Sequence, residues 1–197
     1  MSTFIDLITS VVVFGVLALT VGRIQSNINV SMYENQFNVV VQTNAVELAR
    51  QVEWDFAKIG HHVTGQKILY ADSSEIRYYA DIDNNHIIHT IRFFTGDTSQ
   101  CLSTSNLRDV PLFRLQDGNP VQQNWGLIGM RLSYYDDANT EIGTPIIGAS
   151  QLARIHSIGV SFRLQSAEPV ISPQDTTWAE VCWEKTIVPR NLGDLSY

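Results

Sequence analysis

Residues 7–22 read LITSVVVFGVLALTVG, a charge-free stretch bracketed by Asp6 and Arg23. Its sixteen residues fall short of the about 20 that span a bilayer, but Phe4, Ile5 and Ile24 extend it. Residues 11–19 are apolar on every face, which favours a membrane segment. The residues MSTFID lack the basic charge of a signal peptide. A buried core helix is the remaining alternative.

The helix is expected to continue far beyond the apolar segment (residues 7–22). No proline or glycine interrupts residues 23–59, and Gly60 follows, the favoured residue just past a helix end. We therefore predict one helix from about Thr3 to Ile59, about 85 Å long. Its second half carries one apolar stripe, spaced by three or four residues, which we expect to pack on a globular domain. This packing stripe consists of Phe37, Val41, Ala45, Leu48, Val52 and Phe56.

After Gly60 the apolar pattern changes from helical to alternating, which is typical of strands. Alternation over 75–82, a turn at 83–85 and a strand at 86–94 predict a hairpin. Further strands are expected at about 111–115, 128–134, 158–164 and 178–188. No helical pattern separates them, so the sheet should be mainly antiparallel.

The predicted fold class is therefore α+β. A long N-terminal α-helix, apolar and then amphipathic, packs on a mainly antiparallel β-sheet domain. We expect the helix to occupy residues 1–60, with its first half in a membrane or filament core, and the globular β-domain to occupy residues 61–197.

Composition narrows the function classes. The chain of 197 residues is 44% hydrophobic, which excludes disorder and a multi-span membrane protein. Its net charge of -7 and the lack of a basic patch make nucleic acid an unexpected partner. No P-loop, GxSxG, HExxH or CxxC motif is present, so we expect no enzyme and no cofactor.

The candidate ligating residues argue against a metal site. His86 and His89 are three apart on a predicted strand, so their side chains should point to opposite faces. His61 and His62 sit at the helix end, where capping or solvation is expected. Asp81, Asp83 and Asn85 match the start of a calcium loop. However, His86 stands where such a loop has glycine, and Arg92 stands where it has its final glutamate. A turn is therefore favoured for this segment. Calcium binding through other loops stays open.

The two cysteines, Cys101 and Cys182, are too few for a disulfide scaffold or a four-cysteine zinc site. They could form one disulfide if the chain is exported; otherwise we expect two buried thiols.

The chain resembles the type IV pilin and pseudopilin superfamily. Residues 3–8 (TFIDLI) are similar to that family's N-terminal stretch, and residues 47–56 followed by Ile59-Gly60 are similar to the helix end of minor, J-type or PilW-like pseudopilins. The pieces 81–83 and 187–192 also look similar. The family carries a short leader that a peptidase removes and a glutamate as fifth mature residue. This sequence starts at Met1 without a leader, and removal of Met1 would make Asp6 the fifth residue.

The resemblance implies a structural subunit of a bacterial type IV pilus-like filament or of a type II secretion pseudopilus. Such a subunit is anchored in the inner membrane before assembly and becomes periplasmic or extracellular as a filament in the cell envelope. Its partners are copies of itself or other pilin-like subunits. Asp6 would pair with the α-amino group of a neighbour and set the register. The apolar side chains expected at the assembly surface are Phe4, Ile5, Leu7, Val11, Phe14 and Leu17.

One alternative function belongs to another class. The helix could be only the single-span anchor of a β-domain that binds a protein or a glycan. A bare anchor gains nothing from an acid at position 6, because a carboxylate at the membrane end of an apolar helix is costly unless paired.

Overall fold

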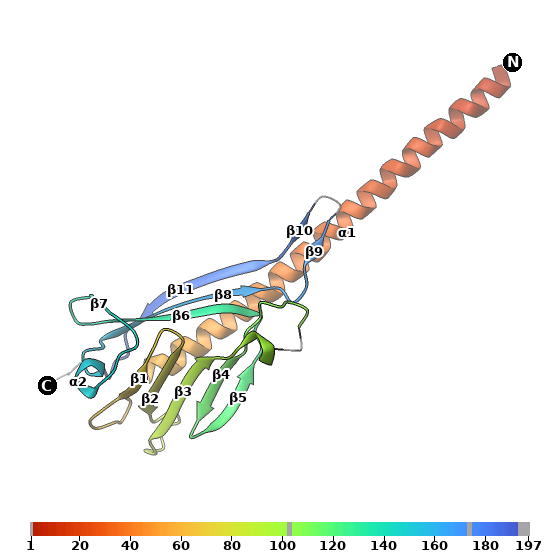
Figure 1. Cartoon of the computed structure of the whole chain (residues 1–197). Helices are drawn as coiled ribbons and strands as arrows, with labels where there is room; N and C mark the ends of the chain where they lie inside the picture. The colour runs from red at the N-terminus through yellow and green to blue at the C-terminus, as the bar shows by residue number, and fades with distance from the viewer. Residues whose placement is uncertain (1, 102–103, 173–174, 193–197) are drawn as a thin grey trace.

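The computed structural model describes residues 2–101, 104–172 and 175–192, and it confirms the predicted α+β fold class. Helix α1 runs without interruption over Ser2–Ala57, and its 56 residues give a length of about 84 Å. Its first half projects from the molecule, and its second half lies along the β-strands (Figure 1). Met1, at the start of the expected helix range 1–60, lies outside the described residues. So do residues 193–197, at the end of the expected β-domain range 61–197.

A five-stranded antiparallel sheet follows the helix and keeps the strands in chain order, β1-β2-β3-β4-β5. The short 3₁₀ helix η1 (Thr98–Gln100) lies between its third and fourth strands. The five strands are β1 (Ile68–Ala71), β2 (Glu75–Ala80), β3 (His89–Thr95), β4 (Leu112–Gln116) and β5 (Asn119–Gln123).

A second antiparallel sheet has the order β11-β8-β6-β7, and β9 and β10 form a two-stranded ribbon. The sequence pattern predicted one sheet, which is wrong because β6 pairs with the distant β8 instead of the preceding β5. The one-turn helix α2 (Ala149–Leu152) was also not predicted. The strands are β6 (Leu127–Tyr135), β7 (Glu141–Ile142), β8 (Ser157–Gln165), β9 (Val170–Ile171), β10 (Thr176–Thr177) and β11 (Glu180–Ile187).

Both large sheets and the second half of α1 share one hydrophobic core. The ring of Phe56 lies edge-on to Tyr78 of β2 and Phe93 of β3, with centroids 6.2 and 5.6 Å away. The second sheet contributes Val160 of β8 and Tyr134 of β6, whose hydroxyl donates to the backbone oxygen of Asp72 at 2.9 Å. The helix is therefore held from two sheets at once.

Gly60 ends the helical region, as the sequence predicted. Its φ is +74°, a backbone conformation that glycine adopts without steric cost. A Cβ built there would lie 2.8 Å from Cδ of Lys67. The Gly60 N–H donates to the oxygen of Tyr79 at 2.9 Å, so the turn after α1 is joined directly to β2.

The disulfide considered from the sequence is not formed, and Cys101 and Cys182 are both free. Cys101 is buried just after η1, beside the five-stranded sheet, whereas Cys182 is exposed on β11, an edge strand of the other sheet. The alternative of two buried thiols therefore holds only for Cys101.

Candidate assembly surface

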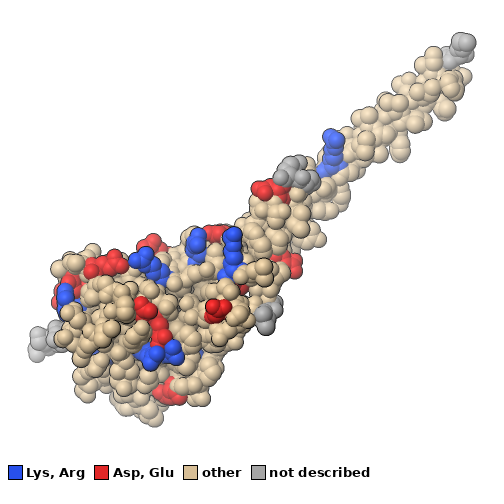
Figure 2. All heavy atoms as spheres, in the orientation of Figure 1, with Lys and Arg blue, Asp and Glu red and all other residues tan. Residues whose placement is uncertain are grey.

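The projecting half of α1 exposes a continuous apolar surface. The large apolar side chains from Phe4 to Val21 are between 48 and 73% exposed. In the described part of the chain, α1 is the one helix long and apolar enough to cross a membrane, and its most apolar window of 18 residues contains no buried residue. Figure 2 shows this region almost free of charged side chains, which gather on the globular part. The alternative of a buried core helix is therefore wrong.

The predicted assembly residues all lie on this exposed surface, although they do not share one face. At about 100° per residue, the steps of three and four place five of them within an arc of about 140°, while Ile5 lies about 100° from Phe4 on the other side. The rest of the circumference is apolar as well, so the helix can meet neighbours on several sides. The five residues in the arc are Phe4, Leu7, Val11, Phe14 and Leu17.

Two polar side chains within the apolar segment are satisfied by the helix itself. The hydroxyl of Thr9 donates to the oxygen of Ile5 at 2.9 Å, and the hydroxyl of Thr20 donates to the oxygen of Val16 at 2.8 Å. An unsatisfied hydroxyl is costly in an environment without water. These internal hydrogen bonds make the segment compatible with lipid or with a dry helix bundle.

Asp6 lies exposed at one end of the charge-free segment, and Arg23 lies exposed at the other. The sixteen residues between them span about 24 Å, close to the about 30 Å of a bilayer core. Within the described residues, no lysine, arginine or histidine pairs with Asp6.

The packing stripe lies where the sequence analysis expected it, against the sheets. Phe37 is half-buried, and every later member of the stripe is buried. Lys185 of β11 also pairs with Glu53 at 2.7 Å, and Asn44 donates to the oxygen of Trp125 at 3.2 Å. These contacts attach the second half of α1 to the globular part, from which the first half projects. The buried members are Val41, Ala45, Leu48, Val52 and Phe56.

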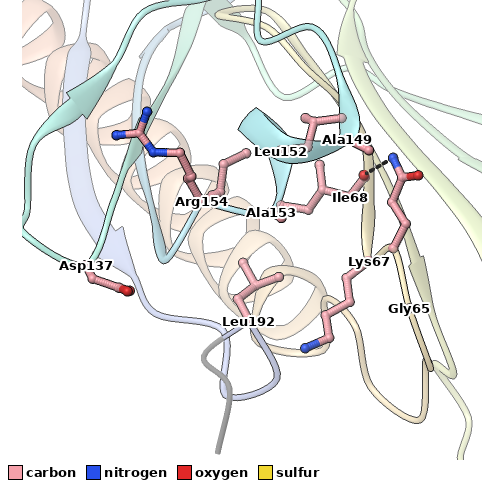
Figure 3. A pocket seen from close by; sticks show the side chains of 11 residues that line it. Gly65, Lys67, Ile68, Asp137, Ala149, Leu152, Ala153, Arg154 and Leu192 are labelled. Carbon is pink, nitrogen blue, oxygen red and sulfur yellow. Dashed lines mark hydrogen bonds between the residues drawn. The ribbon is translucent and has the colours of Figure 1, made fainter.

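A pocket of about 420 Å³ lies at the far end of the globular part, between β1, α2 and the chain near Leu192 (Figure 3). Its wall is partly apolar, and its charged groups, Lys67, Asp137 and Arg154, come from three separate segments. Arg154 pairs with Asp136 at 3.0 Å. Its described lining residues include no nucleophile–base pair.

The sequence analysis missed one cluster of side chains. It placed His86 on a strand, but β3 begins only at His89, and His86 lies in the preceding loop with a φ of +65°. The loop turns His86 toward His62, and both approach Asp81. The signal for such a turn was the Asp/Asn-rich run 81–85, but no sequence pattern links that run to the helix end.

No family model matches the chain, and no curated protein matches it. Among solved structures, a type IV-like pilin from Thermus thermophilus is similar over 78% of this chain and 95% of its own, with 11% identity and a TM-score of 0.47.

Proposed function

We propose that the chain is a structural, non-catalytic subunit of a pilin-like filament. The observation that carries the proposal is the exposed apolar half of α1, continuous with a second half that is buried in the β-domain. The projecting half anchors the subunit in the membrane, and in the filament it packs against the same half of neighbouring subunits. The β-domain then faces outward.

A comparison of the free energy of the apolar segment in the membrane and in the filament bundle gives Asp6 a role. Burying each large apolar side chain contributes about 1.5–3 kcal/mol relative to water, so the segment does not stay in solvent. Lipid tails are as apolar as leucine, however, so apolar contacts alone do not favour a bundle over the membrane. A polar pair formed only in the bundle supplies the missing preference. We assign this pair to Asp6 and the α-amino group of a neighbouring subunit, which also sets the axial register.

The finer assignment follows the resemblance of residues 47–60. On that basis we propose that the chain is a minor, J-type or PilW-like pseudopilin of a bacterial type IV pilus or type II secretion system. In that setting the subunit waits in the inner membrane with its β-domain in the periplasm. It then joins other pilin-like subunits as an oligomer.

The test is assembly of the full chain and of two variants at position 6. The chain is purified in detergent, the detergent is removed, and electron microscopy shows the product. Wild type and Asp6→Glu, which keeps the charge, are expected to form filaments, and Asp6→Asn is expected to lose most of them. Thermal unfolding of the β-domain should be the same in all three, because Asp6 lies outside the core. Wild type that stays monodisperse, or Asp6→Asn filaments like those of wild type, would contradict the proposal.

A second candidate is a β-domain on a single-span anchor that binds a protein or a glycan. The pocket between β1 and α2 favours it, because apolar and charged groups meet there. This function requires monodisperse particles in detergent and no effect of Asp6→Asn. A ligand screen with Arg154→Ala as the pocket variant would then identify the bound class.

A further inference from the structure

A compact group of metal-ligating side chains lies just beyond the end of α1. His62 follows the helix, while Asp81 and His86 belong to the loop between β2 and β3. One potential ligand atom from each of the three residues lies within 4.8 Å of the other two. We call these three residues the histidine cluster. It is separate from the projecting helix and from the pocket near α2.

Asp81 organises the histidine cluster. Its side chain is buried, and its Oδ2 lies 2.7 Å from Nδ1 of His62 and accepts the N–H of His86 at 3.0 Å. Its Oδ1 accepts the N–H of Asn85 at 3.2 Å. The backbone N–H of Asp81 itself donates to the oxygen of His61 at 3.1 Å. The carboxylate of Asp81 therefore joins the turn after α1, through His62, to the β2–β3 loop, through the N–H groups of Asn85 and His86.

The imidazoles are held together by an unusual backbone. His62 and His86 have φ values of 56° and 65°, in the left-handed region that few non-glycine residues adopt. Their rings stack with centroids 4.9 Å apart, and His61 stacks on His62 at 4.0 Å. The stacked rings present two imidazoles side by side, and imidazole nitrogen is a common metal ligand in proteins.

We propose that His62, Asp81 and His86 bind a divalent transition-metal ion, with Zn²⁺ as the representative case. Two imidazole nitrogens and one carboxylate suit Zn²⁺, Ni²⁺ or Cu²⁺, whereas Ca²⁺ and Mg²⁺ take oxygen ligands. Ligand atoms around tetrahedral zinc lie about 3.4 Å apart, so separations of up to 4.8 Å would close by up to about 1.4 Å. The exposed side chains of His62 and His86 would make that adjustment by rotating. Water completes the coordination.

Asp81 supplies the anionic ligand, because its buried carboxylate already lies 2.7 Å from Nδ1 of His62. A bound metal would join the turn after α1 to the β2–β3 loop and so stabilise the folded β-domain by mass action.

The chain contains a matched control for this site. His156 and Asp137 also form a histidine–aspartate contact, with Nδ1 and Oδ1 2.9 Å apart and the histidine 38% exposed. His62 is 41% exposed in its own pair. The candidate metal cluster found in the described part of the chain does not include His156. The two histidines are similarly exposed, but the partner of His62 is buried whereas Asp137 is 90% exposed, and His62 alone has a second imidazole beside it.

The experiment is calorimetric titration of the full chain in detergent with ZnCl₂. Wild type is expected to bind one ion, and His62→Asn and His86→Asn are each expected to weaken binding about tenfold or more. His156→Asn should bind as wild type does. Asparagine is chosen because it tolerates the left-handed backbone, and circular dichroism checks that each variant is folded. Lack of binding at millimolar zinc, or unchanged binding in both cluster variants, would overturn the proposal.

A second measurement needs no substitution. Electron paramagnetic resonance of the wild-type chain loaded with one equivalent of Cu²⁺ should show coupling to two imidazole nitrogens. Coupling to one nitrogen or to none would overturn the assignment. Neither experiment depends on filament formation, so its outcome is independent of the proposed assembly function.

Discussion

Asp55 of α1 and Arg114 of β4 form a two-point ion pair between residues 59 positions apart. Nε of Arg114 donates to Oδ2 at 2.8 Å, and its second nitrogen donates to Oδ1 at 3.1 Å. Asp55 is 3% exposed, and the Tyr78 hydroxyl donates to its backbone oxygen at 3.3 Å. The hydrogen bond to Asp55 raises the pKa of Arg114 above its usual value and outweighs burial, which lowers that pKa. The pair fixes the helix to the five-stranded sheet.

Removing one partner of this pair should destabilise the β-domain strongly. Arg114→Leu leaves a buried carboxylate without its cation, which costs about 3–5 kcal/mol. The double variant Asp55→Leu/Arg114→Leu removes both charges and should be more stable than Arg114→Leu alone. The free energy of unfolding of each variant is measured by urea denaturation, with tryptophan fluorescence as the signal. A double variant less stable than the single one would contradict this account of the pair.

Two phenylalanines on the same helix should behave in opposite ways. Phe56→Ala opens a cavity beside Tyr78 and Phe93 and should lower the free energy of unfolding by about 3–5 kcal/mol. Phe14 is 73% exposed, so Phe14→Ala should change that free energy by less than about 0.5 kcal/mol while reducing filament yield. Unfolding curves and electron microscopy separate the effects. Equal loss of stability in both variants would argue against an exposed Phe14.

Acid should destabilise the β-domain through Asp81. The folded pKa is about 2, below the ordinary value of 3.8. The ionised carboxylate therefore contributes stability that is complete above about pH 4 and is lost as the pH falls toward 2. Between these values, the stability difference between wild type and Asp81→Asn should shrink. Chemical unfolding at a series of pH values in the presence of a chelator measures it; a constant difference would contradict the lowered pKa.

The two cysteines should differ in reactivity. Cys182 is exposed and should react with Ellman's reagent in the folded chain. Cys101 is buried, and both its burial and the charge of Asp109 raise the pKa of its thiol, so it should react only after unfolding. The expected stoichiometry is one thiol in buffer and two in denaturant. No free thiol in denaturant, with a mass two hydrogens lower, would instead show the disulfide.

The long helix was predictable because its pattern is local. The absence of helix breakers over 23–59 and the spacing of the packing stripe gave its end within two residues of Ala57, with Gly60 just beyond. Strict alternation likewise indicated β2, β6 and β8, whose side chains alternate between core and surface. The short strands β1, β7, β9 and β10 lack enough residues for such a pattern to stand out, and β5 (NPVQQ) has too few apolar residues.

Pairing between distant segments was not predictable. Nothing local shows that β6 leaves the first sheet to pair with β8, or that Asp55 meets Arg114. The strand expected at 86–94 lost its first three residues to the loop because Asp81 accepts the N–H groups of Asn85 and His86. The expectation that histidines would not share a site rested on that strand. It compared His86 with His89, whereas the fold brings His86 to His62.

Local sequence pattern is enough to specify a long helix with an apolar first half and a striped second half. Both properties follow from the periodicity of neighbouring residues and from the need to keep apolar surface away from water. The two-sheet arrangement, the free state of Cys101 and Cys182, and the meeting of His62, Asp81 and His86 arise from the three-dimensional packing. These features depend on contacts between distant segments, which are selected by the packing of the whole core.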